Sequence, residues 1–115
     1  MEIWNESKSF RISDNAELRA SFWGRFRGLM LSKRKDIILA AKKDSVVDST
    51  IHMMFMLYPI DVIWAADDMT VVDVRKQIKP SLWRMHKPKN PAKYVVEIAT
   101  GEIKDTDIGD MIAFR

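Results

Sequence analysis

The chain of 115 residues contains no cysteine and only four glycines and four prolines. Without cysteine, disulfide bonds, thiolate metal sites and cysteine nucleophiles are all excluded. The amino-terminal segment MEIWNESKSF lacks the apolar core of a signal peptide, so we expect a cytoplasmic protein. The chain has no P-loop, no G-x-G-x-x-G sequence and no G-x-S-x-G elbow, so common nucleotide-binding and serine-nucleophile motifs are absent.

The composition is that of an ordinary folded domain. Hydrophobic residues make up 47% of the chain and charged residues 30%, which is typical of a globular protein rather than a disordered one. No internal repeat, low-complexity tract or Gly/Ser linker divides the sequence, so we interpret residues 1–115 as a single domain. The formal net charge of +3 is mild and favours anionic partners only weakly.

Short apolar runs between turn residues predict a β-rich protein. One helix is predicted from about Asn15 to Phe26, with Asp14 as its cap, Glu17 completing a capping box and Gly28 ending it. Leu18 and Phe22 would share its apolar face. The pattern indicates roughly seven or eight short strands, including Glu2–Trp4, Ser9–Ile12, Asp36–Ala41, Ile60–Trp64, Thr70–Arg75, Tyr94–Ala99 and Met111–Phe114. Thr70–Arg75 alternates well enough to be a hairpin partner of Ile60–Trp64. We therefore expect a β-rich α+β fold, either a small barrel or a sandwich.

The longest apolar run, Ile51–Ala66, is interrupted only by His52, Pro59 and Asp61. It is too short for a membrane span, and a span would carry neither this proline nor this carboxylate, so no membrane partner is expected. We interpret the run as two consecutive strands, bent at Pro59 and buried on both faces. Together they would form a hairpin-like core.

Asp61 is the anomaly in this core. A buried carboxylate must be paired, hydrogen-bonded or protonated, and Arg25 and Arg27 at the end of the predicted helix are possible partners. One interpretation is a structural acid that ties a backbone turn or anchors an arginine. The other is an acid that grips a ligand or takes part in catalysis.

His52 shares one face of its predicted strand with Met54 and Met56, because side chains alternate along a strand. Imidazole and thioether groups are suitable ligands for Cu(I). The opposite face is equally apolar, however, so the methionines are better explained as adaptable core residues. We expect no metal and no cofactor, and the candidate ligand-binding residues are Asp61, Arg25, Arg27 and His52.

A second candidate is a basic segment near the middle of the chain. No acidic residue lies between Asp73 and Glu97, and Tyr94 is close to the end of this interval. Basic surfaces that include aromatic side chains are suited to single-stranded nucleic acids, although a solvated loop gives the same pattern. The residues concerned are Arg75, Lys76, Lys79, Trp83, Arg84, Lys87, Lys89 and Lys93.

Three stretches follow a recognisable order: RFRGLM at 25–30, IHMMFMLYPIDV at 51–62, and YVVEIA at 94–99 followed by Gly101, Gly109 and Asp110. They resemble the R-x-x-GLM, M-x-x-x-P-[IL]-D and YV-x-E-x-x-x-G…GD motifs of the family called domain of unknown function 192, or uncharacterised protein family 0127. The resemblance spans roughly residues 16–112, and the IHMMFM variant is archaeal in style. It implies a small β-rich domain with a short helix, and it supplies no activity or cofactor.

Three functions therefore remain open. The leading hypothesis is a non-enzymatic binding module with a groove near Asp61 and Arg25 for a small or peptide-like ligand. The first alternative is binding of single-stranded nucleic acid or another polyanion through the segment Arg75–Lys93. The second is a hydrolase or lyase that uses Asp61 as acid or base. We expect a monomer or a weak homodimer.

Overall fold

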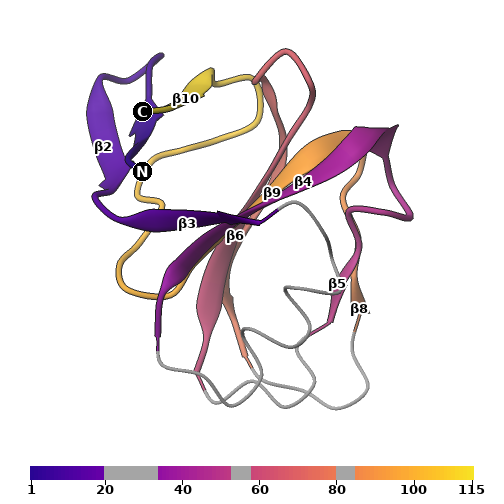
Figure 1. Ribbon diagram of the computed structural model, residues 1–115, viewed down its shortest axis with the longest axis horizontal. Coiled ribbons are helices and arrows are strands. Elements are labelled where there is room, and N and C mark those ends of the chain that lie inside the picture. Colours follow the sequence, from indigo (N-terminus) through magenta and orange to yellow (C-terminus); the bar gives the residue numbers. More distant parts are fainter. Residues whose placement is uncertain (20–33, 53–57, 80–84) are drawn as a thin grey trace.

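The computed structural model describes residues 1–19, 34–52, 58–79 and 85–115 (Figure 1). Their secondary structure consists of strands, with no interpretable helix among them. The strands are β1 (Ile3–Asn5), β2 (Phe10–Ser13), β3 (Ala16–Arg19), β4 (Asp36–Ser45), β5 (Ile51–His52), β6 (Ile60–Ala65), β7 (Val71–Ile78), β8 (Met85–His86), β9 (Ala92–Ile98) and β10 (Ile112–Phe114).

The central layer is a five-stranded sheet in the order β3-β4-β9-β6-β7. Its neighbours are antiparallel except for β3, which runs parallel to β4. Strand β6 is buried along its whole length because β7 and β9 flank it and both sheet faces are covered. Within the described residues the sheet is open, with β3 and β7 at its edges.

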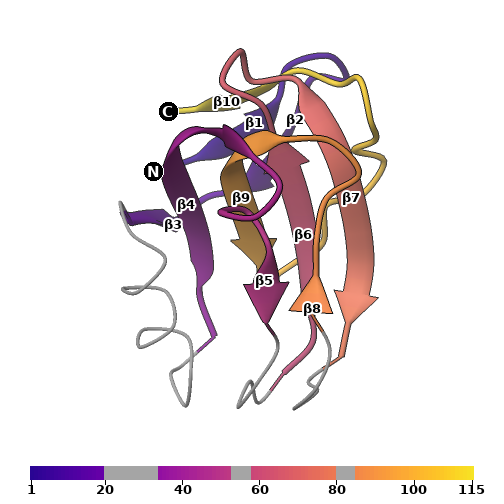
Figure 2. The same cartoon turned by 90° about the vertical axis from the view of Figure 1, so that its right-hand side faces the viewer.

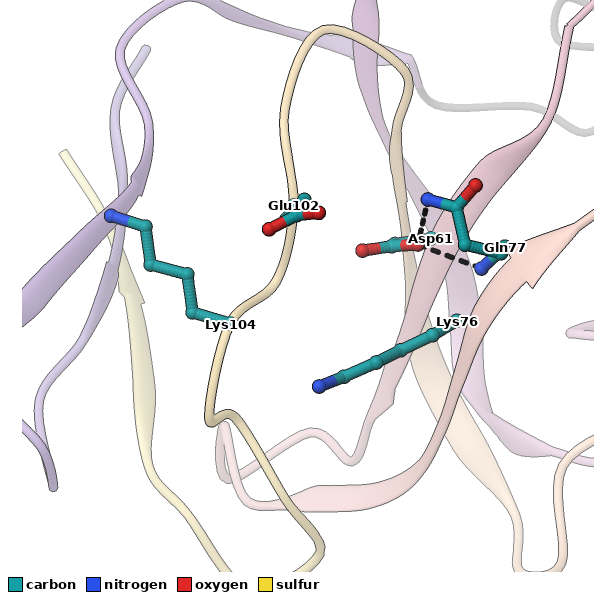
Figure 3. Close-up of a pocket in the computed structure, with 5 residues that line it drawn as sticks. All are labelled: Asp61, Lys76, Gln77, Glu102 and Lys104. Atoms are coloured by element: carbon teal, nitrogen blue, oxygen red, sulfur yellow. Dashed lines mark hydrogen bonds between the residues drawn. The ribbon is translucent and has the colours of Figure 1, made fainter.

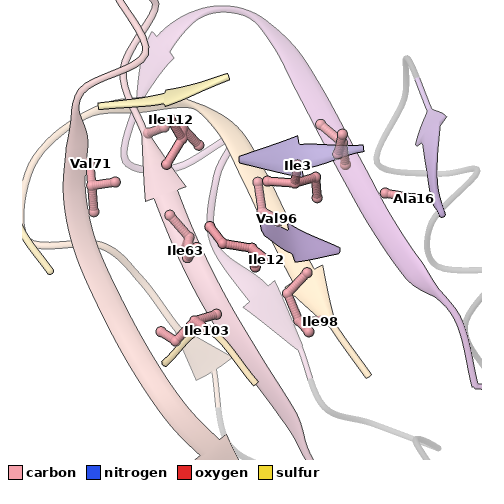
Figure 4. Close-up of a cluster of buried hydrophobic side chains, with 11 residues drawn as sticks. Ile3, Ile12, Ala16, Ile63, Val71, Val96, Ile98, Ile103 and Ile112 are labelled. Carbon is pink, nitrogen blue, oxygen red and sulfur yellow. The ribbon is translucent and has the colours of Figure 1, made fainter. Parts of the chain in front are cut away.

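One face of this sheet packs against a three-stranded sheet in the order β10-β1-β2, which joins the two ends of the chain (Figure 1). Ile3, Ile12 and Ile112 of the small sheet meet Ile63 and Val96 of the central one in a single buried cluster (Figure 4). Burying an aliphatic side chain of this kind contributes roughly 1.5–3 kcal/mol. This apolar contact is the main attachment between the two sheets.

The other face holds a second buried cluster, which includes Ile37, Val62 and Trp64. The short pair β5-β8 lies in front of this face (Figure 2). Trp64 is fully buried, and its indole Nε1 donates a hydrogen bond of 2.7 Å to the carbonyl oxygen of Ser49. The central sheet is therefore covered on both sides.

The predicted helix from Asn15 does not form at its first residues. Ala16–Arg19 is strand β3, paired residue by residue with β4, and residues 20–26 lie outside the described part of the chain. Leu18, expected on the apolar helix face, is 51% exposed, whereas Ala16 is buried against the small sheet. Strand pairing therefore overrides the capping-box pattern here, as tertiary context often does.

The strand predictions for the rest of the chain are largely confirmed, with one correction to the apolar run. The chain bends at Tyr58, directly before Pro59, and β6 pairs with β7 as the sequence predicted. However, β5 pairs with β8 in a separate sheet, so β5 and β6 do not form a hairpin. The hairpin partner of β6 is the strand after it.

A polar cluster fastens the small sheet to the loop that precedes β10. The amide of Asn5 donates to Thr106 Oγ1 at 3.1 Å and to Asp110 Oδ2 at 2.9 Å, and Lys8 Nζ lies 3.0 Å from the same Asp110 oxygen. Burial alone raises the pKa of Asp110. The hydrogen bonds from Asn5, the Asp107 backbone and Lys8, with the charge of Lys8, outweigh burial and hold that pKa below its usual value.

No helix in the described segments is long and apolar enough to cross a membrane.

Candidate functional site

Asp61 lies at the junction of two segments that are far apart in sequence. Its carboxylate is 2% exposed, and each oxygen accepts a hydrogen bond from a backbone N–H. Oδ1 accepts from Gln77 N at 2.8 Å, and Oδ2 accepts from Ile103 N at 3.0 Å. Asp61 therefore connects the end of β7 to the loop that follows β9, which is a structural role for the buried acid.

The hydrogen bond to Gln77 explains the shape of β7. In the register of β6 and β7, Ile60 is opposite Ile78 and Val62 is opposite Arg75, so two residues of β7 face the single residue Asp61. This is a β-bulge, which leaves a backbone group unpaired in the ladder. The Asp61 carboxylate accepts the N–H of the bulge and thereby satisfies it.

A groove lies beside Asp61, between β7 and residues 102–107 (Figure 3). Its narrow end, of about 90 Å³, is lined by Asp61, Lys76, Gln77, Glu102 and Lys104. Its wider end, of about 340 Å³, is lined by Val74, Lys76, Lys104, Asp105, Thr106 and Asp107. Lys76 and Lys104 line both hollows, which are therefore adjacent, and we call the two together the groove.

Both walls of this groove contain a residue with unusual backbone geometry. Gln77 has a φ of 53° and Lys104 a φ of 58°, in the left-handed region that residues with a side chain seldom occupy. The N–H of Gln77 itself donates to Asp61, and Lys104 directly follows Ile103, whose N–H is the second donor. Such strain persists only where the surrounding structure enforces it, and it is often found at functional sites.

The loop wall is fixed by alternating buried and exposed residues. Ile103 is fully buried in the cluster beneath the small sheet, and Thr106 is 3% exposed and accepts the hydrogen bond from Asn5. The charged residues beside them, Lys104 and Asp105, are exposed. The wall is therefore rigidly attached while its charged side chains remain accessible.

The charges differ between the two walls. Lys76 extends from β7 toward the loop, whereas the side chain of Lys104 points away from Asp61 and places its ammonium over the Phe10 ring (Figure 3). Within the described part of the chain, Lys76, Glu102 and Asp105 take part in no ion pair. The groove is lined mainly by charged groups, which differs from the apolar walls expected of a ligand pocket.

The other candidate ligand-binding residues are placed as follows. Arg25 and Arg27 lie outside the described residues, so their predicted pairing with Asp61 stays a prediction. For His52 the structure describes the backbone, which is paired with Met85 in the β5-β8 sheet, and not the side chain. The described partners of Asp61 are backbone N–H groups and the Gln77 amide.

The basic segment is partly neutralised by internal contacts. The Arg75 guanidinium lies 3.2 Å from His86 Nδ1, donates to the Lys87 carbonyl oxygen at 3.0 Å and lies 4.0 Å from Asp73. Lys93 forms an ion pair of 3.0 Å with Asp67.

The hydrogen bond and charge of Asp67 raise the pKa of Lys93. Of the remaining residues of this segment, Trp83 and Arg84 lie outside the described residues, and the side chains at the surface are Lys76, Lys79, Lys87 and Lys89.

Three further buried acids were not singled out from the sequence. Asp36 is 2% exposed and accepts hydrogen bonds from Ser13 Oγ and from the backbone and side chain of Thr100. Asp73 accepts from Lys89 N at 3.0 Å, and Glu97 is 2% exposed on the central strand β9. Apart from Glu97, each begins or interrupts an apolar run, as Asp61 does.

No group of three or more His, Cys, Asp or Glu side chains suitable for a metal ion occurs in the segments that the structure describes.

The fold and the groove define a small β-rich domain with a polar surface hollow. A model of the DUF192 family, described as "Uncharacterized ACR", matches residues 3–114. The chain therefore belongs to this family, as the three motifs indicated.

Archaeal relatives confirm the assignment. A UPF0127 protein of Thermococcus kodakarensis is 35% identical over 116 residues, which is 97% of this chain and 72% of the relative. A UPF0127 protein of Pyrococcus abyssi is 36% identical over 113 residues, covering 96% of this chain and 94% of the relative. Both are uncharacterised, so the relationship carries no activity.

Two solved structures share the fold. A protein of Sinorhizobium meliloti, described provisionally as a transcription regulator, has a TM-score of 0.79 and 18% identity, covering 97% of this chain and 89% of that one. A protein of unknown function from Novosphingobium aromaticivorans has a TM-score of 0.79 and 19% identity, covering 98% and 82%. At these identities the likeness concerns the fold alone.

Proposed function

We propose that the chain is a non-enzymatic binding module that takes a small or peptide-like ligand in the groove beside Asp61. The observation that carries this proposal is the position of the Asp61 carboxylate, which holds one groove wall with each oxygen. A buried acid used in this way fixes the position of both groove walls relative to each other. Preorganised sites of this kind bind with little further ordering of the protein.

The charged lining supports a polar ligand. A free charged side chain at a groove wall is well hydrated and gains from a ligand that brings an opposite charge and hydrogen-bond partners. Lys76 and Glu102 meet this condition, since neither takes part in an ion pair within the described residues. The size of the wider end, about 340 Å³, is at the lower end of the range for small-molecule sites.

Backbone amide shifts in a ¹H–¹⁵N NMR titration test the proposal. The probes are free amino acids, dipeptides and short dicarboxylic acids at millimolar concentration. The amide signals of Gln77 and Ile103 should move, because these N–H groups join the walls to Asp61. Lys76→Gln should weaken binding severalfold, whereas Lys43→Gln, at an exposed position on β4, should not. If no probe moves the groove amides, the proposal is wrong.

Binding of single-stranded nucleic acid through Arg75–Lys93 remains the alternative. The contacts of Arg75 with Asp73 and of Lys93 with Asp67 argue against it, because those charges are partly satisfied within the protein. A single-stranded oligonucleotide added to the same titration would separate the two functions. Nucleic-acid binding would weaken steeply with salt and would move signals of Lys87 and Lys89.

The enzymatic alternative assigns Asp61 the role of acid or base. Its enclosure and its two backbone hydrogen bonds favour the structural role instead. A panel of generic hydrolase and lyase substrates, compared between the natural chain and Asp61→Asn, tests this alternative.

A further inference from the structure

The two walls of the groove carry charges of opposite sign that form no ion pair with any described residue. The β7 wall presents the ammonium of Lys76, and the loop wall presents the carboxylates of Glu102 and Asp105. Lys104 adds little positive charge to the groove itself, because its ammonium lies 5.4 Å from the centre of the Phe10 ring and points away from Asp61 (Figure 3).

Opposite charges on neighbouring surface segments commonly pair directly, as Lys8 does with Asp110 at 3.0 Å in the same region. Across this groove Lys76 and Glu102 form no such pair in the described structure. Asp61 ties the backbone beside each charge to one carboxylate, so neither wall shifts freely toward the other. The gap therefore keeps two complementary charges separated by a space that a ligand can fill.

We propose that this groove binds a zwitterion of the amino-acid or peptide type. The ligand's carboxylate lies against Lys76, and its ammonium lies against Glu102 and Asp105. This inference rests on the proposed function, because it names the chemical class of ligand for the same groove. The volume of about 340 Å³ at the wider end has room for one or two amino-acid residues rather than for a long chain.

A zwitterion explains the mixed lining better than a singly charged ligand does. A purely anionic ligand at Lys76 would face the carboxylates of the loop wall and be repelled. A purely cationic ligand would leave Lys76 without a partner and would be repelled by it. Only a molecule with both charges matches both walls, and charge complementarity of this type provides specificity more than raw affinity.

The experiment compares alanyl-alanine with its N-acetylated, C-amidated and doubly blocked forms by NMR titration of the full chain. The free dipeptide should bind most tightly. Blocking either end should weaken binding by about threefold to tenfold, the usual range for one accessible charge pair. The doubly blocked form should bind weakest.

Two variants identify which groove wall binds the amino terminus of the dipeptide and which binds its carboxyl terminus. Lys76→Gln should remove the effect of C-amidation while keeping that of N-acetylation. The double variant Glu102→Gln, Asp105→Asn should do the reverse. All three residues are exposed, so these variants are expected to fold, and Lys43→Gln serves as the matched control on β4.

The outcomes separate the two proposals. If the N-acetylated peptide binds at the groove as tightly as the free one, the zwitterion is wrong while the groove function stands. The same holds if C-amidation has no effect. If no form of the dipeptide moves the groove amides, the zwitterion is again wrong, and the groove function then depends on the other probes of the earlier titration.

Discussion

Replacing Asp61 by alanine tests the structural role of this carboxylate directly. The change leaves the N–H groups of Gln77 and Ile103 without their acceptor. An unsatisfied buried N–H costs about 1–3 kcal/mol, and water can reach Gln77 more easily than the fully buried Ile103. We therefore expect Asp61→Ala to lower the free energy of unfolding by about 2–4 kcal/mol, a large part of the roughly 5–15 kcal/mol typical of a domain.

Asp61→Asn gives an intermediate case. Asparagine keeps one acceptor oxygen and replaces the other with an NH₂ group, which faces one of the two backbone donors. The loss should be about half that of the alanine variant. Urea denaturation followed by tryptophan fluorescence measures both, because Trp64 is buried in the same sheet.

A matched control is Asp44→Ala. The carboxylate of Asp44 also accepts a backbone N–H, from Asp67 at 2.9 Å, but at an exposed position. Water can replace that acceptor, so the loss should stay below about 1 kcal/mol. A loss below about 0.5 kcal/mol for Asp61→Ala would refute the reasoning. Full stability of Asp61→Asn together with lost turnover of a generic substrate would instead support the catalytic alternative.

Three further predictions concern other parts of the fold. Gly109 has a φ of 94°, whereas Gly101 does not adopt a left-handed conformation. Gly109→Ala should therefore lower the free energy of unfolding by about 1–2 kcal/mol, and Gly101→Ala should hardly change it. Similar thermal midpoints for these two variants would contradict this prediction. Asp110 has a folded-state pKa below its unfolded value, so its contribution to stability is present above about pH 4 and is lost as the pH falls through the folded pKa. Asp110→Asn should therefore destabilise the protein more at pH 7 than in acid below about pH 4, whereas an equal loss across this range in urea denaturation would exclude this role. Trp64→Phe loses the hydrogen bond to Ser49 and leaves a void, so a loss of about 2–3 kcal/mol is expected, and a thermal midpoint within about 1 °C of the natural chain would show that the indole contributes little.

The sequence predicted most strands because their apolar residues cluster between turn residues. Ile60–Trp64 and Thr70–Arg75 were expected to form a hairpin, and β6 and β7 do so. The run beginning at Asn15 was misleading, because Asp14 and Glu17 have the spacing of a capping box, yet Glu17 is part of β3 and pairs with β4. Pairing with a strand so distant in sequence is invisible to local patterns.

Asp61 could be predicted from the sequence as a site residue, but its partners and the opposite groove wall could not. Asp61 was recognised because a carboxylate within an apolar run must have a partner, and it does have partners. The partners are backbone groups, which any sequence supplies, so no residue type could reveal them. Glu102 and Asp105 were missed because charged residues in a loop carry no signal until the fold places them opposite Lys76.

The hydrogen bonds to Asp61 also make the amides of Gln77 and Ile103 two probes of groove opening by hydrogen exchange. Hydrogen exchange at the amides of Gln77 and Ile103 requires that each N–H separate from the same side chain. Opening of either wall therefore exposes an amide whose exchange rate can be followed residue by residue. A compound that spans the groove should slow both amides together, so occupancy can be detected in an unfractionated extract before the compound is identified.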